Sequence, residues 1–369
     1  MKRFLYANER IQAFRFLEGK RIGLITNHTG CNRYFQSTAQ ILHKRGVLAA
    51  LFAPEHGIRG DVPAGVEFPD GAEDPTLHVP VFSLYGNHKR PSADSLQNLD
   101  ALAFDIQDVG CRFYTYLTTL QYAMESGLPV MVFDRPNPLG GVRLDGIRLE
   151  PDCVSFVGAE GIPARYGLTI GEYARFLKIH RNIDCDLTVI PCAGWRRNMC
   201  FEECGVPWIP PSPNIPTPLT ALIYSGTCLL EGTSLSEGRG TANPFEILGH
   251  PKLNAERLVE KLERRKLRGV RWRPVHFTPS CSKWVGELCH GVQIHVTDPD
   301  KFHAFSATLS FLQEAGEQLS SLEMTEHFDH LLGTKAFRLG TVSTTQLISQ
   351  SHRDCAAFQK ECQDILIYK

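Results

Sequence analysis

Glu55 and His56 directly follow a short apolar run in the segment LFAPEHGIRG, residues 51–60. A carboxyl group at the end of a buried strand, close to apolar walls, is partly desolvated, and desolvation raises the pKa of a carboxyl group. A general acid that works near neutral pH needs this property. Glu55 is therefore a candidate catalytic acid. The alternative is that Glu55 pairs with Arg59 and only orders the turn.

A second polar cluster, with Asp105, Gln107, Asp108 and Arg112, stands in FDIQDVGCRFYTY. Asp105 and Gln107 share a face in an extended stretch, so both can point into the same crevice. A carboxylate at this place can serve as a second catalytic group or hold substrate hydroxyls. For Asp108 the alternative is structural, as the cap of a helix expected to begin near Arg112.

Three turn segments carry further candidate side chains. They are DRPNP (134–138), SPNIP (212–216) and LSEGRGT (235–241). The prolines of DRPNP make its turn rigid, which suits a positioned binding group or a tight corner. Glu237 and Arg239 stand among glycines, where the backbone can approach a ligand closely. The alternative for this pair is an exposed loop with a weak local ion pair.

The same residue types can also hold a metal ion. His28, Glu55, His56 and Asp108 are acceptable ligands for zinc or manganese. The usual signatures, such as H-E-x-x-H, are missing, so we predict no metal and no cofactor. A serine hydrolase is disfavoured because no G-x-S-x-G follows a strand. A phosphate-binding loop is disfavoured because no G-x-G-x-x-G follows the first strand and no P-loop occurs.

Short apolar runs that end in the polar clusters predict strands. They cover residues 21–26, 47–52, 79–84, 101–104, 130–133 and 186–190. Helical patterns alternate with them at 35–45, 114–126 and 169–180, and the last begins with Thr169 and Glu172 in a capping-box spacing. This alternation predicts a mostly parallel sheet with both faces covered. Ligands bind beyond the carboxyl ends of such strands, so we expect the clusters to form one site.

The segment PWIPPSPNIPTP, residues 207–218, contains six prolines and cannot continue a helix or enter a central strand. We place the domain boundary there, with domains at 1–210 and 211–369. The second half predicts helices at 219–230, 254–267, 302–316 and 340–366 and strands at 270–277 and 292–297. The expected fold is thus α/β, with a Rossmann-like domain followed by a smaller α/β (α+β) domain and a cleft between them.

Composition excludes several classes of protein. The 369 residues carry a formal net charge of −1, and no basic stripe indicates a nucleic-acid or membrane-surface partner. No apolar stretch is long enough to span a membrane. The 12 cysteines are scattered without a C-x-x-C, which favours free thiols in a reducing compartment. Because no signal peptide is recognisable, we predict a cytoplasmic protein, or a secreted or periplasmic one if a leader was trimmed.

Long motifs along the chain resemble one known family. GLITNHTG, LFAPEHGIRG, SLYG, DIQDVGCRFYTY, DRPNPLGG, PSPNIPT, YSGTCLLEGTSLSEGRGT and NPFEILG occur in this order. SKWVGELCHGVQIHV and FDHLLGTKAFR follow. Together they resemble the exo-β-N-acetylmuramidases of the NamZ type over nearly the whole chain. Two positions depart from the family pattern: Tyr166 stands where relatives often have histidine, and Ser225 where they often have proline.

The resemblance implies a glycoside hydrolase that removes terminal non-reducing β-linked N-acetylmuramic acid from peptidoglycan fragments. It implies an active site between a Rossmann-like domain and a smaller carboxyl-terminal domain. The glutamate of the PEHG motif is the family's favoured catalytic residue and corresponds to Glu55. We predict Glu55 as the general acid and His56 as the residue that orients it. Two alternatives remain: a non-catalytic muropeptide- or sugar-binding protein, and a metal-dependent hydrolase.

The second catalytic group stays open at this point. Asp108 and Glu237 are the carboxylate candidates, and the 2-acetamido group of the sugar can act instead. The lactyl carboxylate of muramic acid is best bound by an arginine, and Arg59, Arg112 and Arg239 are equal candidates. The full set of predicted substrate-binding residues is Asn27, His28, Arg59, Asp105, Gln107, Arg112, Tyr114, Asp134, Arg135, Asn137, Ser212, Asn214 and Arg239. The only predicted partner is a small saccharide that contains muramic acid.

Overall fold

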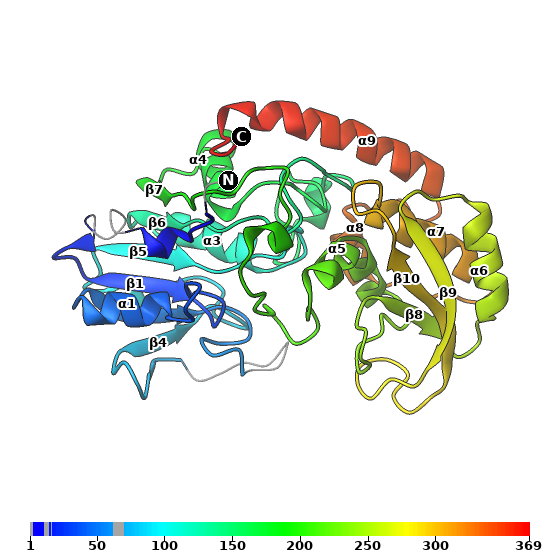
Figure 1. Cartoon of the computed structure of the whole chain (residues 1–369), viewed down its shortest axis with the longest axis horizontal. Helices are drawn as coiled ribbons and strands as arrows, with labels where there is room; N and C mark the ends of the chain where they lie inside the picture. The colour runs from blue at the N-terminus through cyan, green and yellow to red at the C-terminus, as the bar shows by residue number, and fades with distance from the viewer. Residues whose placement is uncertain (1–2, 11–14, 16, 62–69) are drawn as a thin grey trace.

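A computed structural model describes residues 3–10, 15, 17–61 and 70–369 of the chain (Figure 1). Its larger sheet contains β1 (Ile22–Thr26), β2 (Leu48–Ala53), β3 (Ala72–Glu73), β4 (Pro80–Ser83), β5 (Ala101–Asp105), β6 (Val130–Phe133) and β7 (Leu187–Ile190). The strand order is β3-β4-β2-β1-β5-β6-β7. All neighbours pair in parallel except β3 and β4, which pair antiparallel. The predicted mostly parallel sheet is confirmed.

Without the short strand β3, this order is that of a doubly wound Rossmann-like sheet. The chain builds outward from β1 through β2 to β4, then returns to place β5 on the other side of β1. Such a reversal opens a crevice beyond the carboxyl ends of the two central strands. The segments that follow β1, β2 and β5 therefore converge on one edge of the sheet.

Helices cover both faces of the sheet, as the sequence pattern predicts. α1 (Thr38–Lys44) packs on the face that carries Leu24, while α3 (Tyr116–Met124) and α4 (Ile170–His180) pack on the face that carries Ile25. Leu24 and Ile25 are adjacent in β1, and their side chains point to opposite faces of the sheet because side chains alternate along a strand. The short α2 (Ala93–Leu96) precedes β5. The predicted capping box of Thr169 and Glu172 is present at the start of α4.

The carboxyl-terminal half contains a smaller antiparallel sheet in the order β8-β10-β9. Its elements are α5 (Pro218–Thr227), a 3₁₀ turn (Cys228–Gly232), β8 (Ile247–His250), α6 (Ala255–Arg264), β9 (Val270–Phe277), β10 (Cys289–Val296), α7 (Ala304–Gly316), α8 (Glu326–Leu332) and α9 (Thr344–Glu361). The sequence patterns predict most of them but miss β8 and α8. Both are short, and the single apolar cluster that joins this half to the sheet buries them.

The chain end returns to the first half. α9 runs from the smaller sheet back over the Rossmann-like part, and the C-terminus lies near α4 and β7 (Figure 1). The hydroxyl of Tyr368 donates to Asp134 Oδ2 at 2.6 Å, and Glu172 Oε1 accepts from the backbone of Ile367 at 2.9 Å. These contacts tie the last residues to the first sheet. The boundary between residues 210 and 211 stays a prediction.

Two further features bear on the class of protein. In the part of the chain that the structure describes, no helix combines the length and apolarity required to cross a bilayer. All twelve cysteines are free thiols, and nine of them are buried. Burial favours the neutral thiol, so these cysteines act as small apolar side chains.

Candidate active site

A cavity of about 340 Å³ lies between the two halves of the molecule, beyond the carboxyl ends of β2, β4 and β5. The amino-terminal half contributes Glu55, His56, Tyr85, Phe113, Tyr114, Thr115, Phe156 and Val157 to its lining. The connecting segment and the carboxyl-terminal half contribute Ser212, Ile215, Tyr224, Glu231, Arg239, Phe245 and His327. The sequence predicts a site between two domains, and the cavity has this position. The size suits one or two sugar rings, since ligand pockets begin near 300 Å³.

Glu55 follows β2 by two residues and lines this cavity with a partly exposed side chain. Pro54 ends the strand, and His56 adopts a left-handed backbone conformation with φ of 75°, which turns the chain sharply. The hydroxyl of Thr115 donates to Glu55 Oε2 at 3.3 Å. Thr115 precedes α3, so the helix start helps to hold the carboxyl group in the cavity.

His56 is buried, with 4% of its surface exposed, and lines the same cavity. Glu55 forms no ion pair with Arg59, which pairs instead with Asp74 at 2.9 Å. The alternative in which Glu55 pairs with Arg59 is therefore wrong. The carboxyl group of Glu55 stays available to a ligand in the cavity.

Glu231 is a second carboxylate in the cavity and comes from the opposite half. Its Oε1 accepts from Arg239 Nη2 at 2.5 Å, and its side chain is 23% exposed. Burial alone raises the pKa of Glu231, but the hydrogen bond from His327 and the charge of Arg239 outweigh it and lower the pKa. Glu231 is therefore ionised at neutral pH.

Glu237 is placed differently from Glu231. Its side chain is 2% exposed and accepts from Lys283 Nζ at 2.9 Å and from Ser282 Oγ at 3.1 Å. Arg239 Nε lies 3.4 Å from Glu237 Oε1. Glu237 does not line the cavity. These contacts hold the carboxylate of Glu237 between Lys283 and Arg239.

Only one of the three candidate arginines lines the cavity. Arg59 lies on the surface beside Asp74. Arg112 is 1% exposed, and its two terminal nitrogens donate to the carbonyl oxygens of Ile147, Ile162, Leu331 and Leu332. It joins the two halves and has no access to a ligand. Arg239 remains, and no hydrogen bond from its Nη1 to another described residue is present.

Asp108 also lies outside the cavity lining. Its Oδ2 accepts from the backbone of Gly110 at 2.6 Å and from the hydroxyl of Tyr166. The helix that follows begins at Tyr116, with Thr115 at its N-cap position, so the prediction that Asp108 caps this helix is wrong. Burial raises the pKa of Asp108 to about 6, although both hydrogen bonds act in the opposite direction.

The other strand-end acids and their neighbours hold the framework together. Asp105 forms a buried ion pair with Arg135 at 2.5 Å, and Asp134 accepts from Thr169 Oγ1 at 2.8 Å. Neither acid lines the cavity. Three amide side chains bind the turns beside them: Asn27 accepts from Thr29, Gln107 donates to Pro136 O, and Asn137 donates to Leu168 O. These residues bind the turns next to the cavity, and none of the three amides lines it.

The remaining predicted residues divide into two groups. Tyr114 and Ser212 line the cavity, whereas His28 and Asn214 do not. His28 Nε2 lies 2.7 Å from Pro210 O, and its burial lowers its pKa. Within residues 3–10, 15, 17–61 and 70–369, no three His, Cys, Asp or Glu side chains are arranged to hold a metal ion.

Comparison with known proteins identifies the family. One family model, described as the N-terminal part of exo-β-N-acetylmuramidase NamZ, matches residues 22–219. A second, described as its C-terminal part, matches residues 222–368. The chain belongs to the NamZ exo-β-N-acetylmuramidase family. The resemblance inferred from the motifs is confirmed.

Individual relatives agree with this membership. The peptidoglycan β-N-acetylmuramidase NamZ of Bacillus subtilis (strain 168) is 46% identical over 369 residues, covering 95% of this chain and 88% of the relative. A crystal structure of a DUF1343 family protein from Bacteroides fragilis NCTC 9343 covers 100% of both chains, with a TM-score of 0.93 and 35% identity. A second protein of that family and organism covers 99% of both chains, with a TM-score of 0.80 and 30% identity.

Several cavity residues of this NamZ-family chain were not among the predicted site residues. They include one carboxylate and one imidazole, Glu231 and His327, and the aromatic residues Tyr85, Phe113, Phe156, Tyr224 and Phe245. Glu231 lies within the quoted motif YSGTCLLEGTSLSEGRGT, so the motif itself was a usable signal. His327 lies on α8, for which no sequence pattern was recognised.

The two departures from the NamZ pattern lie beside the site and not in it. Tyr166 is buried and donates its hydroxyl to Asp108. Ser225 lies inside α5, where its Oγ donates to Leu222 O at 2.7 Å. Neither side chain lines the cavity. Both affect the support of the site rather than its surface.

Replacing Asp108 with asparagine should flatten the dependence of stability on pH. The pKa of Asp108 is about 6 in the folded chain and 3.8 as its ordinary value, so the folded state binds the proton more tightly. Its contribution to stability is therefore present at low pH and is lost as pH rises through 6. Between pH 5 and 8 the wild type should lose about 1 kcal/mol that Asp108→Asn does not lose.

This difference is measured by denaturant unfolding at both pH values. Asp184→Asn is the control, since Asp184 is exposed. It should keep the pH dependence of the wild type. An Asp108→Asn variant with an unchanged pH dependence would show that Asp108 is ionised in the folded state.

Proposed function

We propose that this NamZ-family chain is an exo-β-N-acetylmuramidase that releases terminal β-linked N-acetylmuramic acid from peptidoglycan fragments, with Glu55 as general acid. The observation that carries the proposal is the placement of Glu55 in a cavity built by both halves, together with the ionised Glu231. The activity printed for the Bacillus subtilis relative supports the same conclusion.

In the proposed reaction, the proton of the Glu55 carboxyl group passes to the glycosidic oxygen as the bond from this oxygen to the anomeric carbon breaks. The leaving sugar departs as an alcohol, and positive charge develops on the anomeric carbon and ring oxygen. Water then supplies a hydroxyl group to the anomeric carbon, and its second proton returns to Glu55. His56, next to Glu55 in the lining, is proposed to orient the acid.

We assign the second carboxylate to Glu231 in place of Asp108 and Glu237. The group that supports the developing positive charge must itself be negatively charged and must be a different carboxylate from the proton donor. His327 and Arg239 keep Glu231 ionised. Glu237 already pairs with Lys283, and Asp108 is buried outside the cavity. Glu231 therefore supports the positive charge that develops on the sugar.

Arg239 is our choice for the residue that binds the lactyl carboxylate. It is the only one of the three candidate arginines in the lining, and Nη1 remains for a ligand after Nη2 has bound Glu231. An arginine binds a carboxylate through charge-assisted hydrogen bonds. This contact would distinguish muramic acid from N-acetylglucosamine, which lacks the lactyl group.

Replacing Arg239 with methionine should reduce the preference for muramic acid by about 10- to 100-fold, the value of one charged hydrogen bond. The measurement is the ratio of kcat/KM for the 4-nitrophenyl β-glycosides of N-acetylmuramic acid and N-acetylglucosamine. A ratio is used because Arg239 also holds Glu231 and the variant can lose rate on both substrates. Arg59→Met, at the surface, should keep the ratio. If Arg239→Met keeps it too, another group binds the lactyl carboxylate.

The overall function is tested with two isomeric disaccharides and mass spectrometry. The protein should cleave N-acetylmuramyl-β-1,4-N-acetylglucosamine to its monosaccharides and leave N-acetylglucosaminyl-β-1,4-N-acetylmuramic acid intact. Binding without cleavage would instead support the muropeptide-binding alternative. Cleavage that stops on addition of a chelator would support the metal-dependent alternative.

We further propose that this reaction serves peptidoglycan recycling in the cytoplasm. Support comes from the twelve free cysteines, since thiols persist in reducing compartments and secreted proteins usually pair them. A fractionation experiment with an antibody to the chain tests it. Recovery of the protein outside the cytoplasmic fraction would contradict this location without affecting the proposed reaction.

A further inference from the structure

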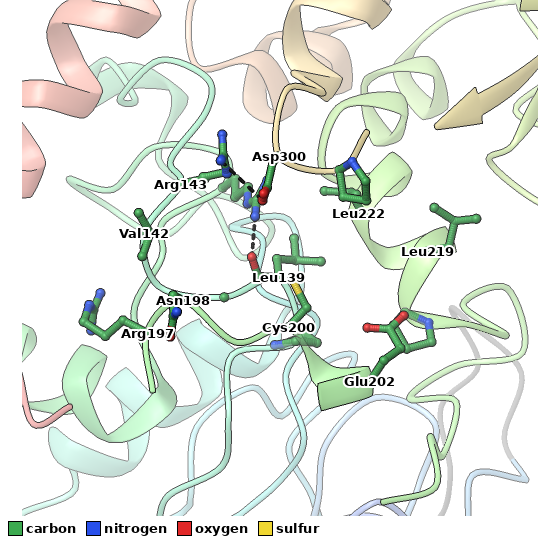
Figure 2. A pocket seen from close by; sticks show the side chains of 15 residues that line it. Leu139, Val142, Arg143, Arg197, Asn198, Cys200, Glu202, Leu219, Leu222 and Asp300 are labelled. Atoms are coloured by element: carbon green, nitrogen blue, oxygen red, sulfur yellow. Dashed lines mark hydrogen bonds and ion pairs between the residues drawn. The ribbon is translucent and has the colours of Figure 1, made fainter. Parts of the chain in front are cut away.

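A second cavity, of about 360 Å³, opens between the two halves (Figure 2). It shares no lining residue with the catalytic cavity. Its walls come from the turns after β6 and β7, from the start of α5 and from the turn before α7. Leu219 and Leu222 project from α5 on one side, across from Val142 and Arg197 on the other (Figure 2). Nothing in the proposed reaction uses this space.

Arg165 distinguishes this cavity from an ordinary surface hollow. The side chain lines the cavity although only 5% of its surface is exposed. Among the described residues, no carboxylate lies within ion-pair distance of its guanidinium group, which donates one hydrogen bond, to Leu139 O. Its Nε has no acceptor in the described chain, and burial lowers the pKa of Arg165, although the charges of Asp145 and Asp300 act in the opposite direction. A buried guanidinium group that lacks an ion-pair partner and most of its hydrogen bonds is unfavourable.

Arg112 shows how the same fold binds the terminal nitrogens of a buried guanidinium group when no ligand is needed. Arg112 is 1% exposed, also lacks a carboxylate partner in the described chain, and has an Nε without an acceptor there, as Arg165 does. Its two terminal nitrogens, however, donate to four carbonyl oxygens. Arg165 donates to one. Arg165 therefore keeps more N–H groups free for a ligand than Arg112 does, and its side chain lines a cavity.

The other charged groups of the cavity are already engaged or lie at its edge. Arg143 pairs with Asp300 at 3.3 Å, and Arg197 binds Glu172 at 2.7 Å (Figure 2 shows the first pair). Glu202 is exposed. Arg165 is thus the cation that remains for a ligand. It can take a single negative charge without displacing an existing ion pair.

Apolar side chains supply the rest of the surface. Leu139 and Leu222 are buried in the wall, while Val142 and Leu219 are 52% and 41% exposed. Large apolar side chains left open around a cavity commonly mark a ligand site. The ligand that fits such a surface has an apolar body next to its single charge.

We propose that this cavity binds a small amphiphilic monocarboxylate, with its carboxylate at Arg165 and its apolar body against Leu219 and Leu222. The cavity volume is at the low end of ligand pockets, which limits the ligand to a compact molecule. Because the walls come from both halves, such a ligand bridges them. The proposal is independent of the hydrolytic reaction.

The test is isothermal titration of the full chain with hexanoate, acetate and hexanamide. Hexanoate should bind at least tenfold more tightly than acetate, which lacks the apolar body, and than hexanamide, which lacks the charge. Equal affinity for hexanoate and hexanamide would overturn the role of Arg165. Equal affinity for hexanoate and acetate would overturn the apolar part, and absence of hexanoate binding would overturn the proposal as a whole.

Variants locate the binding. Leu219→Glu places a negative charge at the cavity, and an acid in the first turn of α5 is compatible with the helix. It should weaken hexanoate binding at least tenfold, whereas Leu339→Glu, at an exposed leucine outside the cavity, should not. Binding that survives Leu219→Glu and is lost in Arg239→Met would place hexanoate in the catalytic cavity and overturn the proposal.

Discussion

Replacement of Glu55 with glutamine is expected to lower kcat for cleavage of N-acetylmuramyl-N-acetylglucosamine by about 10²- to 10⁴-fold, the contribution typical of a general acid. Glutamine has nearly the same shape and can still accept the hydrogen bond from Thr115. It cannot donate a proton to the glycosidic oxygen. The thermal midpoint should therefore remain close to that of the wild type while turnover falls.

The leaving group distinguishes an acid from a residue that only binds substrate. A 2,4-dinitrophenolate leaves without protonation, so Glu55→Gln should lose far less activity on the 2,4-dinitrophenyl β-muramide than on the disaccharide. An equal loss on both substrates would point to a binding role for Glu55. Wild-type turnover of the disaccharide by Glu55→Gln would remove Glu55 from the mechanism.

The part of the site that the sequence predicts is local. β2 is a run of apolar residues that ends at Pro54, and Glu55 stands two residues beyond the strand. Parallel strands collect the segments after their carboxyl ends at one edge of a sheet. The sequence therefore predicts both the position of Glu55 and its location in a crevice. The capping box at Thr169 is equally local, and it is also present as predicted.

The part that the sequence cannot predict depends on distant partners. Asp134 follows a strand as Glu55 does, but Tyr368 and Thr169 bind its carboxylate, and Tyr368 lies 234 residues away along the chain. Asp105 likewise pairs with Arg135 inside the framework. A carboxylate at a strand end is therefore either a support or a ligand group. Which of the two roles a carboxylate has depends on the side chains that bind it, and these can lie far away along the sequence.

Glu231 and Glu237 illustrate the same limit within one motif. Both are acids in YSGTCLLEGTSLSEGRGT, both approach Arg239, and their order gives no reason to prefer either. The difference arises from two other segments. Lys283, from the loop between β9 and β10, binds Glu237, while His327, from α8, binds Glu231 at the cavity. No periodic pattern in the sequence predicts α8, so nothing in the sequence brings His327 to the site.

The variants Glu231→Gln and Glu237→Gln test which of the two carboxylates stabilises the developing charge. Glu231→Gln should lower kcat/KM for the disaccharide by about 10²-fold or more, because a preorganised charge at the developing oxocarbenium centre is lost. The variant should remain folded, since glutamine still accepts from Arg239 at a partly exposed position. Turnover is measured by release of N-acetylmuramic acid.

Glu237→Gln should show the opposite pattern. The buried carboxylate is the partner of Lys283, and removal of one member of a buried pair is strongly destabilising, up to about 3–5 kcal/mol. Since Lys283 is 25% exposed, water offsets part of this loss. The free energy of unfolding should thus fall by a few kcal/mol, while kcat/KM of the folded protein stays within a few-fold of the wild type. If activity instead depends on Glu237 and survives Glu231→Gln, the carboxylate that stabilises the developing charge is the one bound to Lys283.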